Sequence, residues 1–254
     1  MRTLSLLLTL FSICLSQTST PSAYTAFLTW RKVPANAALT WEQATEKYEA
    51  KLRAEGISPT IASKTMSIIA AHDEGSYYDP VYSSPKPKSP TAPTPLLVEA
   101  AALRKPGRAL DIAMGQGRNA LYLARQGWDV TGFDTSQQGL NHARKSAAAA
   151  RLRLNAIHAS DEEFDFGVAQ WDLIALIYPI EKRSVYRIRQ ALKPGGVAVV
   201  ECSHKEGSNA PFEYGTNELL EIFSGFRIVK YEDSHRFHEW AGKTLRIVRL
   251  IAVK

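Results

Sequence analysis

The chain has 254 residues, of which 45% are hydrophobic and 22% are charged, and its formal net charge is +6. This is the composition of an ordinary globular protein, long enough for one medium domain with an appendage. Two cysteines, Cys14 and Cys202, exclude a disulfide framework and give no zinc-type spacing, so no metal site is expected. The basic residues are scattered rather than clustered, so we expect no nucleic-acid partner.

The first 23 residues read as a signal peptide or N-terminal anchor. One Arg precedes an apolar run from Leu4 to Leu15, and small polar residues follow it. This is the layout of a secretory signal, and the run is short for a bilayer span, so no strong membrane binding is expected beyond it. Cleavage after Ser16 would remove residues 1–16. An uncleaved helix and a misassigned start codon are the alternatives, so the sequence leaves the localisation open.

Residues 24–82 are expected to form a helical extension. Thr40 is a candidate N-cap with Gln43 three residues later, and Gly56 is placed to end that helix. A second helix is expected to start at Ser58, and the resulting hairpin would lean on the main domain or cover it. The aromatic stretch 77–82, YYDPVY, fits either a lid wall or core packing. Residues 83–95 hold five prolines and are interpreted as an extended linker.

From residue 96 to 254 apolar strands alternate with helices, which predicts an α/β domain with a parallel sheet covered on both faces. Strands are expected at 108–113, 129–133, 155–159, 172–177 and 197–202. Helices are expected at 96–103, 118–126, 137–150, 181–192 and 218–223. Two final strands, 226–233 and 243–254, are joined by residues 234–242 without room for a helix. They should therefore pair antiparallel.

A glycine motif lies between the first strand and its helix. Gly115, Gly117 and Ala120 match G-x-G-x-x-A, and Asp134 ends the next strand, where it can bind both hydroxyls of a ribose. This arrangement alone fits a dinucleotide about as well as a sulfonium nucleoside.

Three features favour S-adenosylmethionine over NAD. A carboxylate at Asp111 would repel a pyrophosphate but suits the ammonium group of a methionine moiety. Asp161, in SDEEFDF after the third strand, can accept a hydrogen bond from an adenine amino group. The antiparallel C-terminal pair is foreign to an ordinary dinucleotide-binding half.

The same segments resemble a known family. LDIAMGQGRN resembles the glycine motif of class I S-adenosylmethionine-dependent methyltransferases, VTGFD their ribose-binding segment, WDLIALI their fourth strand and LKPGGVAVVE their fifth. GRNALYLARQGWDVTGFD is similar to methyltransferases of the tellurite-resistance type. The resemblance covers residues 96–254 and implies a Rossmann-like, mostly parallel seven-stranded sheet with an antiparallel C-terminal strand. Met114-Gly115-Gln116-Gly117 departs from the family's frequent Cys-Gly-x-Gly.

The resemblance also implies roles for individual residues. Asp111 and the backbone from Ala113 to Gly117 would hold the methionine end of the cofactor. Asp134 would bind the ribose, with Thr135 beside it. Asp161 and Glu162 would face adenine, and Ile177 would line the cofactor near the sulfonium. Each of Asp111, Asp134 and Asp161 has a plainer interpretation as a helix cap or turn residue.

The acceptor and any catalytic base are left unassigned. Tyr178 and His204 follow the fourth and fifth strands, where ligands of such sheets bind. His204 fits either a base or a solvated loop residue, and His235 and His238 are expected at the surface. Arg118 and Asn119 are candidates to orient a carboxylate or oxyanion.

The sequence thus predicts methyl transfer from S-adenosylmethionine to a small-molecule acceptor. One alternative is an NAD-dependent oxidoreductase, which Asp111 and the C-terminal hairpin oppose. The other is a non-catalytic binding protein on the same fold. The oligomeric state is left open.

Overall fold

The computed structural model describes residues 23–37, 39, 41–71, 74–84, 90–102, 104–178, 182–206 and 213–254. The signal-like segment, including Cys14 and Ser16, and the candidate N-cap Thr40 lie outside these residues. Within them, no helix is long and apolar enough to cross a membrane. The chain divides into two compact units, residues 1–72 and 73–254.

The first unit is helical and has its own core. Its helices are α1 (Ala23–Arg31), α2 (Pro34–Ala37), α3 (Trp41–Ala54) and α4 (Pro59–Ala71). Phe27, Tyr48 and Ile69 are buried together, with the Phe27 and Tyr48 rings in edge contact at 5.1 Å between centroids. Gly56 follows α3 with φ +78°, a conformation that glycine adopts without strain. The predicted hairpin therefore corresponds to α3 and α4, with two shorter helices added.

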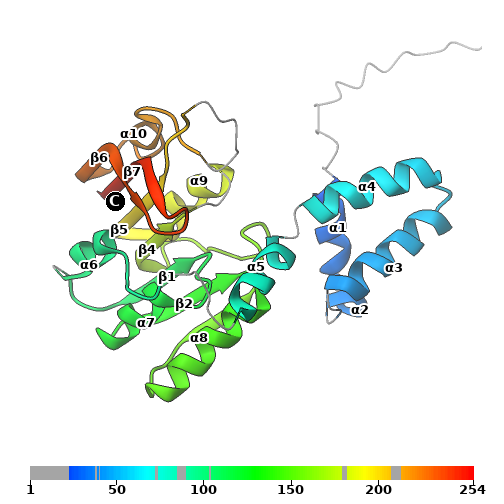
Figure 1. The fold of residues 1–254 in the computed structure, drawn as a ribbon, viewed down its shortest axis with the longest axis horizontal. Helices are drawn as coiled ribbons and strands as arrows, with labels where there is room; N and C mark the ends of the chain where they lie inside the picture. Colours follow the sequence, from blue (N-terminus) through cyan, green and yellow to red (C-terminus); the bar gives the residue numbers. More distant parts are fainter. Residues whose placement is uncertain are drawn as a thin grey trace, which may run out of the picture. The chain divides into compact units, whose positions relative to one another are not determined.

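The second unit is built on a seven-stranded sheet, shown in Figure 1, with the order β3-β2-β1-β4-β5-β7-β6. β7 is antiparallel to both of its neighbours, and the other strand pairs are parallel. The strands are β1 (Arg108–Ile112), β2 (Asp129–Asp134), β3 (Asn155–His158), β4 (Trp171–Ile177), β5 (Leu192–Ser203), β6 (Arg227–His238) and β7 (Lys243–Val253). The predicted fold, a mostly parallel seven-stranded α/β sheet with an antiparallel C-terminal strand, is confirmed.

Successive side chains of each strand point to opposite faces of the sheet and pack into two separate cores, one on each face. α6 (Pro95–Ala102), α7 (Arg118–Arg125) and α8 (Gln137–Ala149) cover one face, where Ala109 and Val130 are buried beneath them. α9 (Lys182–Ala191) and α10 (Glu218–Ile222) cover the other, over Leu110 and Phe133. Because both faces are buried, β1 and β4 are nearly continuous apolar runs, which is why the sequence locates them well.

Two features differ from the sequence-based expectation. β6 continues to His238, so most of the expected connection at 234–242 is strand. A further helix, α5 (Glu74–Ser83), lies in the second unit, although residues 24–82 were assigned to the extension. It belongs with the sheet because Asp79 accepts hydrogen bonds from Ser136 and Gln138 at the start of α8.

Candidate functional site

The glycine turn, residues 113–117, connects β1 to α7 at the carboxyl edge of the sheet. The Gly115 N–H donates to Asp134 Oδ2 and the Ser136 N–H donates to Asp134 Oδ1, both at 2.7 Å. These bonds tie the end of β2 to the turn. Burial raises the pKa of Asp134, while the two backbone donors act to lower it. Asp134 is therefore a fixed acceptor that lies directly beside the turn.

Asp111 lies one strand away and is only 2% exposed. Its Oδ2 accepts from the Ala120 N–H at 2.9 Å, in the first turn of α7. Gly117 has no side chain to cap this helix, so Asp111 supplies the missing acceptor from a distance. Burial raises its pKa to about 7, with Asp134 adding to the shift and Arg118 opposing it. One of its oxygens thus has the capping role that was the plainer interpretation.

The two glycines of the motif face different neighbours. A Cβ atom at Gly117 would lie 2.9 Å from Ala143 Cβ and 3.2 Å from Met114 Cε, so Gly117 allows α7 and α8 to approach each other. A Cβ atom at Gly115 would collide with the hydroxyl oxygen of Tyr82. Only Gly115 therefore turns its open side toward the region beside Asp134.

Aromatic side chains gather over this region. Tyr82 is buried, and its ring centroid lies 6.4 Å from that of Tyr78 and 6.2 Å from that of Trp240, which follows β6. Burial raises the pKa of Tyr82, and the Asp134 carboxylate adds to the effect. The stretch YYDPVY was the sequence signal for this cover. Asp79 and Trp240 had no such signal, because their positions depend on contacts distant in the sequence.

The end of the predicted linker is fixed to the glycine turn rather than extended in solvent. Gln116 Nε2 donates to the Pro90 carbonyl, Arg118 Nη1 donates to the Ala92 carbonyl, and the Thr94 N–H donates to Asn119 Oδ1. Arg118 also pairs with Glu239 at 2.5 Å. Arg118 and Asn119, expected to orient an acceptor, are instead occupied in holding the chain around the site.

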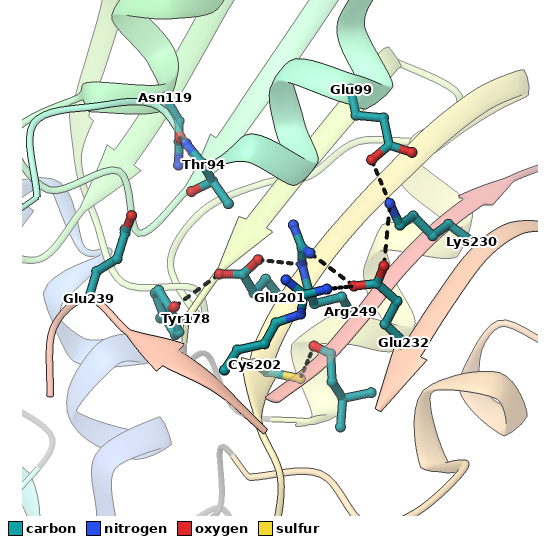
Figure 2. Close-up of polar contacts among 12 residues, drawn as sticks. Thr94, Glu99, Asn119, Tyr178, Glu201, Cys202, Lys230, Glu232, Glu239 and Arg249 are labelled. Carbon is teal, nitrogen blue, oxygen red and sulfur yellow. Dashed lines mark hydrogen bonds and ion pairs between the residues drawn. The ribbon is translucent and has the colours of Figure 1, made fainter. Parts of the chain in front are cut away.

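Tyr178 ends β4 in a left-handed conformation, with φ +71°. Its hydroxyl donates to Glu201 Oε1 at 2.9 Å, and Glu201 Oε2 accepts from Arg249 Nε at 2.9 Å (Figure 2). Burial raises the pKa of Tyr178, and the Glu201 carboxylate raises it further. The phenol therefore keeps its proton and is a poor candidate for a general base.

The histidines lie differently from the sequence-based expectation. His204 is 9% exposed rather than solvated; its Nε2 lies 3.0 Å from Thr216 Oγ1, and its buried Nδ1 has no hydrogen-bond partner among the described residues. His238 is 8% exposed, so its surface assignment is wrong. Its ring lies 4.3 Å from that of Tyr178, and its Nδ1 accepts from the Ala241 N–H. His235 is exposed, as expected.

The remaining candidates follow the same edge of the sheet. Ile177 is buried at the end of β4, next to Glu201 of β5. The carbonyl of Thr135 contacts His158 Nε2 at 2.8 Å. Asp161 and Glu162 lie half-buried in the turn after β3, where Arg187 binds the Asp161 carbonyl. The structure thus joins Asp134 to the glycine turn, sets Asp111 beside it, and places Asp161 and Glu162 one strand further along.

Comparisons with known proteins point to one family. Residues 109–196 match a family model described as a methyltransferase domain. Over 149 residues the chain is 25% identical to "Probable S-adenosyl-L-methionine-dependent methyltransferase TehB" of Haemophilus influenzae, covering 54% of this chain and 52% of that protein. The chain therefore spans about half the length of this curated relative.

Solved structures share the fold. The crystal structure of TehB from Haemophilus influenzae has a TM-score of 0.58 at 19% identity, over 71% of this chain and 67% of that one. An S-adenosylmethionine-dependent methyltransferase from Methanosarcina mazei has a TM-score of 0.54 at 17% identity, over 64% of this chain and 98% of that one.

The site residues fit the cofactor of this family. Gly115 opens the backbone beside Asp134, and Asp111 is a second buried carboxylate where a cationic amino-acid group would be neutralised. No group of three side chains that could bind a metal ion occurs in the described part of the chain. Residues 109–196 thus match a methyltransferase domain, and the chain shares its fold with solved S-adenosylmethionine-dependent methyltransferases.

Proposed function

We propose that this chain transfers the methyl group of S-adenosylmethionine to a small-molecule acceptor. The observation that carries the proposal is the pairing of Asp134 with the Gly115 N–H beside the buried carboxylate of Asp111. Asp134 would hold the ribose hydroxyls, and Asp111 with the backbone of the glycine turn would hold the methionine end. When bound, S-adenosylmethionine supplies an electrophilic methyl group on a positively charged sulfur.

The chain's own contribution would be orientation and exclusion of water. Reactants held in line can gain roughly 7–11 kcal/mol from orientation alone. The aromatic cover from Tyr78, Tyr82 and Trp240 supports exclusion of water from the site until the donor enters, because it brings apolar surface over the glycine turn. A covered site of this kind favours a small acceptor over a macromolecule.

The side chains at the end of β4 also favour an acceptor that needs no base from the protein. The Tyr178 hydroxyl donates a hydrogen bond to Glu201, and the Nδ1 of His238 already accepts one from the Ala241 N–H. Burial lowers the pKa of His238, so the ring is neutral near pH 7 and carries its proton on Nε2. We infer an acceptor that is already nucleophilic when it binds, such as a thiolate, a carboxylate or another oxyanion.

Donor binding gives the first test. Calorimetry should detect binding of S-adenosylmethionine and none of NAD, and Asp134→Ala should weaken donor binding by tenfold or more, as expected for the loss of charged-acceptor hydrogen bonds worth about 1.5–3 kcal/mol. Asp129→Ala is the matched control, because Asp129 lies exposed at the opposite end of the same strand. Binding of NAD alone would restore the oxidoreductase alternative, which no observation now favours.

Acceptor identity needs a second experiment. Purified protein, S-adenosylmethionine and a panel of small thiols, oxyanions and carboxylates should give a product heavier by one methylene group, detected by mass spectrometry. Donor binding without a product from any class of acceptor, macromolecules included, would support the non-catalytic alternative.

A further inference from the structure

α5 is fastened to the part of the fold that follows Asp134. Asp79 Oδ1 accepts from Ser136 Oγ at 2.5 Å and from the Gln138 N–H at 3.0 Å. Ser136 is fully buried and is itself the N-cap of α8, since its Oγ accepts from the Gly139 N–H. A carboxylate at the start of a helix is stabilised by the free N–H groups and the helix dipole. Asp79 therefore acts as a latch that fixes α5 against α8.

The latch places the Tyr82 ring in a seat formed by two glycines. A Cβ atom at Gly139 would lie 3.1 Å from ring carbons Cδ2 and Cε2 of Tyr82. A Cβ atom at Gly115 would collide with the Tyr82 hydroxyl oxygen. Because neither residue has a side chain, the phenol lies directly on the backbone of the glycine turn. Only 5% of Tyr82 is exposed to solvent.

The same backbone surface is the one that the donor needs. Asp134, the proposed ribose ligand, is bonded to Gly115 itself, so a nucleoside held by Asp134 must lie against Gly115. The Tyr82 hydroxyl and the donor would then compete for one space. Asp79 also lies close enough to Asp134 to disfavour its ionisation, so the latched helix opposes the charged acceptor that a ribose requires.

We propose that Tyr82 is a gate on the donor site: α5, latched by Asp79, holds the phenol on Gly115, and donor binding requires Tyr82 to leave that seat. The inference rests on the proposed function, since it concerns access to the same site. Opening breaks the bonds of Asp79 to Ser136 and Gln138 and frees the aromatic contact between Tyr82 and Trp240. Donor affinity is therefore set partly by the stability of the latched helix.

Calorimetric titration of the full chain with S-adenosylmethionine tests the gate. Tyr82→Ala and Asp79→Asn should both bind the donor more tightly, by about threefold or more, because apparent affinity falls with the fraction of molecules that is open. Tyr186→Ala is the matched control, an exposed tyrosine on α9, and should bind as the unaltered chain does. Either of two other results for Tyr82→Ala overturns the proposal. Weaker binding would make Tyr82 part of the donor's binding surface, and unchanged binding would mean that Tyr82 does not affect donor binding.

Hydrogen exchange on the unaltered chain tests the same gate without any substitution, so a variant that folds poorly cannot affect the result. The amides of α5 should exchange faster when S-adenosylmethionine is bound than when it is absent, because the donor displaces the helix. Slower or unchanged exchange overturns the gate while leaving donor binding intact. If neither the unaltered chain nor Tyr82→Ala binds the donor, the proposed function itself fails and the gate fails with it.

Discussion

Asp111 combines two demands that conflict. It caps α7 through Ala120, yet its burial raises the pKa to about 7. The folded-state pKa lies above the ordinary value of 3.8, so the folded protein binds this proton more tightly than the unfolded chain does. The stability due to this proton is present at low pH and is lost as pH rises through 7.

We expect Asp111→Asn to remove this dependence on pH. The amide oxygen can still accept from Ala120, so between pH 5 and 8 the variant should avoid a loss on the order of 2 kcal/mol in the free energy of unfolding. Urea unfolding at several pH values measures it, with Asp129→Asn as the exposed control. A variant that is less stable than the unaltered chain at pH 8 would contradict this account. Donor binding should weaken in the same variant, because the charge is lost.

Ala113 carries backbone strain at the entry to the glycine turn. Its φ of +52° lies in the left-handed region, which costs an L-residue about 1–2 kcal/mol. Its side chain is exposed, so Ala113→Gly removes no core contact. Glycine costs about 0.4–1 kcal/mol through the greater freedom of the unfolded chain, which leaves a net gain in the free energy of unfolding of between zero and about 1.6 kcal/mol. Chemical denaturation measures it, and a destabilised variant would show that the methyl group makes a contact worth more than the strain.

Tyr178→Phe separates positioning from base catalysis. The variant keeps the ring that packs on His238 but removes the hydroxyl that donates to Glu201. Since the phenol holds its proton, the turnover number should fall by less than about tenfold, whereas loss of a general base costs 10²–10⁴-fold. A fall of the larger size, with loss of the pH dependence of the rate, would identify Tyr178 as the base. The assay uses whichever acceptor the product screen provides.

Sequence reasoning located the residues whose positions follow from local spacing. Asp111, Gly115 and Asp134 each stand at a fixed offset from a strand end, so the motif predicts where they lie. Tyr82 and Asp79 reach the site only because α5 packs on α8, more than fifty residues away in the chain. His238 was misplaced because its burial depends on where β6 ends.

At the scale of elements, β5 and β7 are joined by a buried ion pair between Glu201 and Arg249. Arg249 also binds Glu232 of β6 at 2.9 Å, and Lys230 links the same strand to Glu99 of α6 (Figure 2). The antiparallel register places Glu201 directly opposite Arg249. Arg249 therefore links the last three strands through their side chains, and Glu201 also binds the Tyr178 hydroxyl.

Breaking this pair from one side should be costly. Arg249→Met leaves Glu201 buried without its cation, and we expect a loss of about 3–5 kcal/mol in the free energy of unfolding. The double variant Glu201→Gln, Arg249→Met should recover most of that loss, because no uncompensated charge remains. Denaturant unfolding of both variants measures the difference. A double variant as unstable as the single one would mean that the pair contributes beyond charge compensation.

Elements were predictable where the pattern of side chains was strong. β1, β4 and β5 are buried on both faces and read as apolar runs. β6 is one of the two edge strands, and its mostly polar, half-exposed side chains give no such run beyond Asp233. α5 escaped prediction because Pro80 lies inside it, and proline removes a backbone donor that a helix interior normally uses.

At the scale of the whole molecule, two units with separate cores should unfold separately. The first unit packs Phe27, Tyr48 and Ile69 among its own helices, while the second packs two faces of a sheet. A helical unit of this size buries a smaller share of its surface than the sheet unit does, so it should be the less stable one.

Calorimetry should therefore record two transitions in the full chain, each responding to its own core. Phe27→Ala should lower the first transition alone and Leu110→Ala the second alone, since a large-to-small change in a core costs about 2–5 kcal/mol locally. S-adenosylmethionine should raise only the second transition, because a ligand stabilises the unit that binds it. A single transition that both substitutions lower would mean that the two cores unfold as one cooperative body. A rise of the first transition with the donor would mean that the helical unit itself takes part in donor binding.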